Sequence, residues 1–152
     1  MHFHTMRTLV IGVGNLLRCD DGVGIHVADE ISQLGLGIDA IDVGLGSVEI
    51  LEAMKGYDKV FIVDATVTGS KPGTVHIVEM SKGEAPLNVT HSHGVDILTT
   101  LRLGERLYDG LPEVTLIGVE AGDTISLDES CTPEVEEAID RVIEIIRSRT
   151  GA

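Results

Sequence analysis

Aromatic and sulfur-containing residues are scarce in this sequence. Its 152 residues include no Trp, two Phe and two Tyr, so any core has to be built from aliphatic side chains. The two cysteines, Cys19 and Cys131, lie far apart and fit no zinc-finger or CxxC spacing, which excludes a structural zinc module. A chain with so few cysteines suits a reducing compartment, and we expect a cytoplasmic protein.

Basic residues are also few, with 11 Lys and Arg against 25 Asp and Glu and a formal net charge of −14. This balance excludes a basic surface for nucleic acid and disfavours docking on anionic lipid. No segment approaches the ~18 consecutive apolar residues of a membrane-spanning helix, so membrane insertion is not expected. The start of the chain lacks the apolar stretch of a signal peptide. Neither charge nor composition indicates whether the chain self-associates.

Short β-rich segments alternate with segments of helical periodicity along the chain. Eighteen glycines suit the tight turns that join such elements. The pattern predicts one α/β domain over residues 1–152, with helices on both faces of a largely parallel, mixed sheet. We expect strands at 7–11, 38–43, 59–63, 74–80 and 114–119, the fourth at an edge, and helices at 23–34, from 47 to just before 56, at 94–103 and from 133 onward.

The last of these helices has the clearest pattern. Thr132 and Pro133 are placed to begin it, as a cap followed by proline in the first turn. Its apolar residues recur at helical spacing, and those expected to face inward are Val135, Ala138, Ile139, Val142, Ile145 and Ile146. Its acidic residues should account for much of the net charge as solvated surface.

Carboxylates follow several of the predicted strands. Asp20 and Asp21 come after the first, and Asp42, Asp64 and Glu120 come at the ends of three others. In open α/β sheets, ligands bind beyond the carboxyl ends of the strands. Carboxylates that meet at one edge repel one another unless a cation shares the site. The sequence therefore predicts a cation site, or a site for a basic peptide, at this edge.

Three familiar kinds of active site fit poorly. Residues 12–17 begin like a dinucleotide-binding fingerprint, but Leu17 stands where its third small residue belongs. Neither a GxSxG nor an HExxH motif occurs. Cys19 could be a nucleophile with His91 or His93 as its base, but a small, buried apolar residue is the more ordinary role for it.

The chemistry then rests on Asp21, Asp64 and the histidines His91 and His93 of the segment THSHG. Carboxylates with imidazole suit nickel or zinc, and such a set leaves coordination positions open. Structural roles are the alternatives. Asp20 or Asp21 could cap the helix from Val23, Asp64 could bind turn amides, and both histidines could be ordinary loop residues. His26 and His76 are expected to be structural or exposed.

Residues 11–24, IGVGNLLRCDDGVG, resemble the N-terminal signature of the hydrogenase maturation endopeptidases. These proteases trim the C-terminal extension from the large-subunit precursor of NiFe hydrogenases. The resemblance continues in order through residues 62–65, 90–94, 116–120 and 127–135, and it implies a three-layer α/β/α sandwich. It also implies that Asp21, Asp64 and His91 are the metal ligands and catalytic residues. His91 is favoured over His93 because it follows Thr90 in a His-x-x-Gly frame.

The resemblance further implies that nickel arrives with the precursor, already held by precursor cysteines, and that the three residues complete its coordination. The expected partner is a NiFe hydrogenase large-subunit precursor. Three other functions remain open: a nickel-checking chaperone without proteolysis, an unrelated small-molecule hydrolase on the same fold, and a metal-independent protease of the spore-germination type.

Overall fold

The computed structural model describes residues 5–44, 47–80 and 97–152, whose strands form one five-stranded sheet. The strand order is β2-β1-β3-β5-β4, and β4 is antiparallel to β5 while the other pairs are parallel. The prediction of a largely parallel, mixed sheet with the fourth strand at an edge is therefore confirmed. The strands are β1 (Thr8–Val13), β2 (Asp39–Val43), β3 (Lys59–Thr66), β4 (Val75–Glu79) and β5 (Glu113–Glu120).

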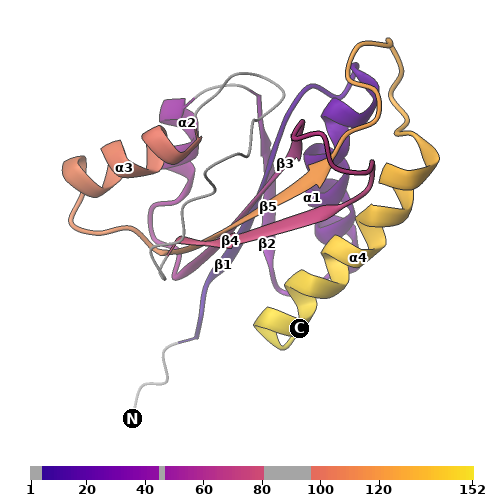
Figure 1. Ribbon diagram of the computed structural model, residues 1–152. Coiled ribbons are helices and arrows are strands. Elements are labelled where there is room, and N and C mark those ends of the chain that lie inside the picture. The colour runs from indigo at the N-terminus through magenta and orange to yellow at the C-terminus, as the bar shows by residue number, and fades with distance from the viewer. Residues whose placement is uncertain (1–4, 45–46, 81–96) are drawn as a thin grey trace.

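Helices cover both faces of the sheet. Figure 1 shows α1 and α4 on one side and α2 and α3 on the other, which makes the predicted three-layer sandwich. A short 3-10 helix, η1, precedes α1 and was not predicted. The bounds are η1 (Cys19–Gly22), α1 (Val23–Leu34), α2 (Ser47–Ala53), α3 (Ile97–Leu107) and α4 (Pro133–Thr150). None of the described helices combines the length and apolar character that crossing a membrane requires.

The alternation of side chains along each strand divides the core into two clusters. Phe61, Val63 and Ile117 lie in the cluster beneath α1 and α4, whereas Ile62 and Leu116 lie in the cluster beneath α2 and α3. Successive strand residues point to opposite faces, so a central strand needs apolar residues at nearly every position. β3 meets this requirement because all eight of its residues are buried.

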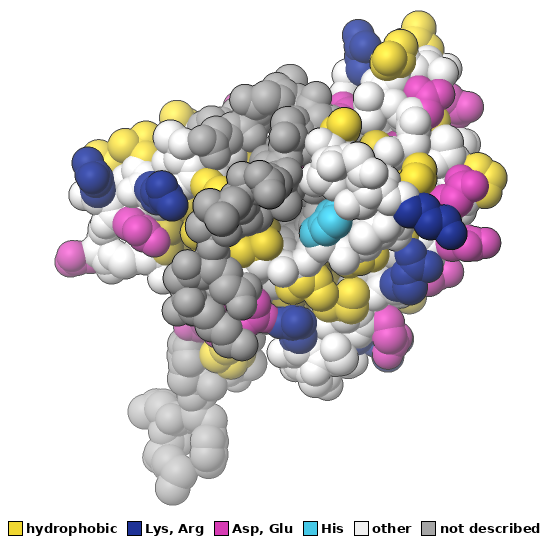
Figure 2. Space-filling view, viewed as in Figure 1, with side chains coloured by type: hydrophobic (Ala, Val, Ile, Leu, Met, Phe, Trp, Pro, Cys, Tyr) yellow, Lys and Arg dark blue, Asp and Glu magenta, His cyan; other side chains and the backbone are white. Residues whose placement is uncertain are grey.

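The ends of α4 follow the sequence pattern, with one change in its buried stripe. Pro133 stands in the first turn, and Gly151 ends the helix in the left-handed region with a φ of 72°. Ile143 is buried and Ile145 is only partly buried, so the assignment of Ile145 to the inward face is only partly right. Figure 2 shows acidic side chains among basic ones over the surface of α4, where Glu134, Glu136, Glu137, Asp140 and Glu144 are exposed.

Helix α3 runs further than predicted. The expected end at residue 103 precedes Gly104, which lies inside the helix. A β-carbon at Gly104 would lie 2.6 Å from Cδ2 of Leu51, so a larger residue there would require the Leu51 side chain on α2 to shift. The predicted first residues of this helix, 94–96, lie outside the described residues.

Candidate active site

Asp64 lies within β3, two residues before the strand ends. The prediction ended this strand at residue 63, but pairing with β5 continues through Asp64 opposite Gly118 and Thr66 opposite Glu120. The side chain of Asp64 is buried, and its Oδ1 accepts a hydrogen bond from the backbone N–H of Ala65 at 2.8 Å. One carboxylate oxygen of Asp64 therefore binds a backbone amide, which is the structural role that the sequence left open.

Asp21 is buried in η1, and three residues beyond it Gly24 brings the chain against the central strands. A β-carbon at Gly24 would lie 2.2 Å from the carbonyl oxygen of Val63, and one at Gly12 would lie 2.2 Å from the carbonyl oxygen of Gly24. Because only glycine permits such contacts, the first turn of α1 rests directly on β1 and β3. η1 consequently packs against β3, at the sheet edge where Asp64 lies.

Asp20 is fully buried and joins three parts of the chain. Its Oδ2 accepts hydrogen bonds from the backbone of Gly122 at 2.8 Å and of Asp123 at 2.9 Å, and from the hydroxyl of Thr132 at 2.8 Å. Its Oδ1 accepts one from the backbone of Thr132 at 2.7 Å. Asp20 therefore anchors the loop that carries Asp21.

The starts of α1 and α4 test two predictions from the sequence. The N-cap residue of α1 is Gly22, so the alternative that Asp20 or Asp21 caps this helix is wrong. Thr132 is the N-cap residue of α4, as predicted, but its side chain makes no cap hydrogen bond within that helix. Its hydroxyl donates a hydrogen bond to Oδ2 of Asp20.

Cys19 has the environment of a structural residue. It is buried, and its backbone adopts a φ of 52°, which is uncommon for a residue with a side chain. Burial and the adjacent Asp20 carboxylate raise the pKa of its thiol, so the thiolate needed for nucleophilic attack is disfavoured. Burial is the main cause, and the negative charge of Asp20 the second, that raise the pKa of the Cys131 thiol to about 12. Both cysteines are suited to packing rather than catalysis.

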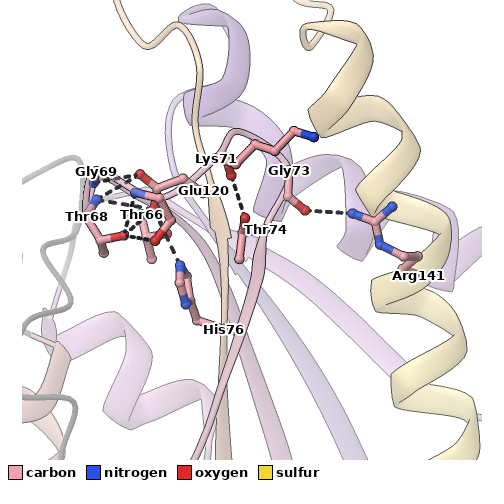
Figure 3. Close-up of polar contacts among 10 residues, drawn as sticks. Thr66, Thr68, Gly69, Lys71, Gly73, Thr74, His76, Glu120 and Arg141 are labelled. Atoms are coloured by element: carbon pink, nitrogen blue, oxygen red, sulfur yellow. Dashed lines mark hydrogen bonds and ion pairs between the residues drawn. The ribbon is translucent and has the colours of Figure 1, made fainter.

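Glu120 ends β5 inside a cradle of hydrogen-bond donors, shown in Figure 3. Thr66 and Thr68 donate their hydroxyls to it at 3.1 Å and 2.7 Å. The backbone N–H groups of Thr68 and Gly69 donate at 2.8 Å and 3.2 Å. Burial raises the pKa of the Glu120 carboxyl, but these hydrogen bonds outweigh burial, and the pKa lies below its ordinary value. Glu120 is thus a buried carboxylate that orders the segment after β3.

The two described histidines outside the signature segments have protein partners. Nε2 of His76 on β4 lies 3.5 Å from Oε1 of Glu120, as Figure 3 shows. A ring nitrogen of His26 on α1 lies 2.7 Å from the carbonyl oxygen of Glu129. Both therefore make structural contacts, as expected. Asp42 stands on the edge strand β2 and is exposed.

The structure brings together some of the predicted site residues. Asp21 and Asp64 are buried at the edge formed by η1 and the carboxyl end of β3, whereas His91 and His93 lie outside the described residues. Within the described ranges, no three His, Cys, Asp or Glu side chains are grouped so that they could hold a metal ion. The cradle of Thr66 and Thr68 was missed by the sequence analysis, because hydroxyl residues near a strand end are common and give no specific signal.

The described residues place buried carboxylates at the carboxyl edge of an α/β/α sheet. Comparison with known proteins places the chain in a class of peptidases. The family model described as hydrogenase maturation protease matches residues 25–149. Hydrogenase 2 maturation protease of Escherichia coli is 30% identical over 93% of this chain and 92% of its own length. A putative hydrogenase maturation protease of Methanocaldococcus jannaschii is 30% identical over 91% of this chain and 92% of its own.

Solved structures agree with these relatives. The NiFe hydrogenase maturation protease HybD from Thermococcus kodakarensis superposes with a TM-score of 0.78 at 25% identity, covering 95% of this chain and 99% of that one. The hydrogenase maturating endopeptidase HybD from E. coli gives a TM-score of 0.75 at 27% identity, covering 95% and 91%. This chain belongs to the hydrogenase maturation protease family.

Proposed function

We propose that this protein removes the C-terminal extension of a nickel-loaded NiFe hydrogenase large-subunit precursor, with the nickel of the substrate as its recognition element. In this proposal Asp21, Asp64 and His91 complete the coordination of that nickel and so place the scissile bond beside it. The observation that carries the proposal is the burial of Asp21 and Asp64 at one edge, where Gly24 packs η1 onto β3.

Burial supports a cation-recognition role for the two carboxylates. Buried carboxylates attract a divalent cation more strongly than exposed ones do, because little water is present to screen the attraction. Carboxylate oxygens with one imidazole suit nickel, and they leave positions for thiolates supplied by a precursor. A precursor without nickel should bind poorly, since it offers no charge to offset this negative edge.

The anchoring by Asp20 supports the same proposal. A site that recognises a metal held by another protein has to be preorganised. If the loop of the site became ordered only on binding, the free-energy cost of ordering it would weaken the binding. The four hydrogen bonds accepted by Asp20 hold the adjacent Asp21 in a fixed loop. Nickel, placed in this way, would polarise the scissile carbonyl or activate water, with a nearby carboxylate as base.

The decisive experiment is mass spectrometry of a large-subunit precursor incubated with this protein, with and without nickel. We expect loss of the C-terminal extension only from the nickel-loaded precursor. Asp21→Asn, Asp64→Asn and His91→Ala should each lower the trimming rate by at least about 100-fold. Asp109→Asn, which changes an exposed carboxylate in the connection between α3 and β5, is the matched control and should trim normally.

Several outcomes would contradict the proposal. Trimming of nickel-free precursor would indicate a metal-independent protease, and nickel-dependent binding without trimming would indicate a chaperone. Loss of activity in His93→Ala with normal activity in His91→Ala would move the proposed ligand to His93. Asp20→Asn should differ from Asp21→Asn because it weakens an anchor, so its main effect should be a lower melting temperature.

A further inference from the structure

Strand β2 ends the sheet and leaves one side of its backbone open. It pairs in parallel with β1, and within the described residues no strand pairs with its other side. Asp39, Ile41 and Asp42 of β2 are exposed. An open edge of this kind offers backbone N–H and C=O groups to any extended chain that lies alongside it.

A groove of about 600 Å³ runs between this edge and helix α1. Its apolar wall is formed by Ile25 and Ala28 of α1 and by Ala40 of β2. These α1 residues are spaced three apart and therefore share one side of the helix. The groove thus combines an open strand edge with apolar contacts for the side chains of an added strand.

The charges that line the groove are all negative. Asp29 on α1, Asp42 on β2 and Glu129 in the loop before α4 contribute carboxylates to it, and no Lys or Arg of the described chain lines it. The whole chain carries a net charge of −14, which adds to the negative potential there. An extended segment that carries both apolar side chains and Lys or Arg would match both the apolar wall and the carboxylates.

One end of the groove reaches the loop that carries Asp21. Leu16 lines the groove, and a β-carbon at Gly22 would lie 3.0 Å from the Cα of Leu16. Gly22 directly follows Asp21, so a segment in the groove would continue toward the proposed cleavage site. Continuity with that site favours a client that is cut there over an unrelated peptide.

We infer that β2 and α1 form a docking groove in which an extended, Lys- or Arg-containing segment of the hydrogenase large-subunit precursor adds to the sheet beside β2. This inference rests on the proposed function for the identity of the client. The groove itself recognises a cationic strand by backbone pairing, by apolar contact with Ile25 and Ala40, and by attraction to Asp29 and Asp42.

A peptide-binding assay tests the groove independently of proteolysis. The probe is a fluorescent seven-residue peptide that alternates Lys and Val, and its affinity is measured by anisotropy at low salt. The double variant Asp29→Lys, Asp42→Lys should bind about tenfold more weakly, because both carboxylates lie at the groove. The double variant Glu137→Lys, Glu144→Lys makes the same charge change at two exposed positions of α4 and is the control. The same peptide with alternate amides N-methylated should not bind, since backbone pairing is blocked.

Trimming of nickel-loaded precursor provides the second arm. The variant Asp29→Lys, Asp42→Lys should raise KM about tenfold, and the control Glu137→Lys, Glu144→Lys should leave it unchanged. If the wild-type protein trims no precursor, the proposed function fails, and the peptide assay still decides whether the groove binds a cationic strand. Equal affinity of Asp29→Lys, Asp42→Lys and of the control Glu137→Lys, Glu144→Lys for the peptide would overturn the inference. So would dimerisation of the wild type that Asp29→Lys, Asp42→Lys abolishes, because a second copy would then occupy the edge.

Discussion

The two faces of the sheet differ at the carboxyl ends of the same strands. Val63, Ala65 and Val119 point into the cluster beneath α1 and α4, which is apolar up to the strand ends. On the opposite face the neighbouring positions are Asp64, Thr66 and Glu120, all buried. A single strand thus supplies packing to one layer and polar groups to the other. Because successive side chains of a strand point to opposite faces, the residues that pack the core and the polar residues near the site lie on different faces of the sheet.

The largest loss of stability is expected from a substitution on the apolar face of the sheet. Phe61→Ala should lower the free energy of unfolding by about 3–5 kcal/mol, because Phe61 is fully buried beneath α1 and α4 and its removal leaves a cavity. Denaturant unfolding measures this change. Leu103→Ala, at a half-exposed position of α3, should stay within about 0.5 kcal/mol of the wild type. Similar losses for both variants would show that this cluster does not dominate stability.

The polar face should respond less, and in a way that depends on pH. Glu120→Gln should lower the free energy of unfolding by about 1–3 kcal/mol near neutral pH, because the amide cannot accept from all the donors around it. The pKa of Glu120 is below its ordinary value of 4.5 in the folded state. The carboxylate therefore stabilises the fold above that value, and this contribution is lost as the pH falls through the folded pKa.

Unfolding measured from about pH 6 down to about pH 3 tests the sign of this effect. The wild type should lose more stability on acidification than Glu120→Gln. Glu144→Gln, at an exposed position, should follow the wild type. Parallel curves for the wild type and Glu120→Gln would show that the cradle does not favour the ionised form.

The smallest effect is expected from a single donor of the cradle. Thr66→Val should lower the free energy of unfolding by about 1 kcal/mol, since it removes one hydroxyl from Glu120 and keeps the volume of the side chain. A double-mutant cycle with Glu120→Gln separates this bond from other effects of the substitution. Additive losses would mean that the hydroxyl and the carboxylate are not coupled.

The fold was largely predictable because its main signals are local. Apolar runs marked β3 and β5, and alternation marked β4 as an edge strand. The helix expected at 23–34 has these bounds, and Gly35 ends it in the left-handed region. Strand ends were less predictable. β3 continues through Asp64 to Thr66 because its neighbour β5 continues alongside, and a polar residue gives no local sign of that pairing.

The candidate site was predictable only in part. Asp20 and Asp21 are adjacent and chemically alike, and what distinguishes Asp20 is its contact with residues 122, 123 and 132, more than one hundred positions away. No local pattern carries that information. The assignment of Asp21, Asp64 and His91 to the site stays a prediction, because His91 lies outside the described residues.

The contacts of Asp20 also have a consequence for the timing of synthesis. A ribosome makes residue 21 early, but the donors that hold its loop are not complete until residue 132 has emerged. The carboxylates of a nascent chain therefore cannot be fixed in place while most of the sheet is still being made. A peptidase built in this way becomes competent only after residue 132 has been made.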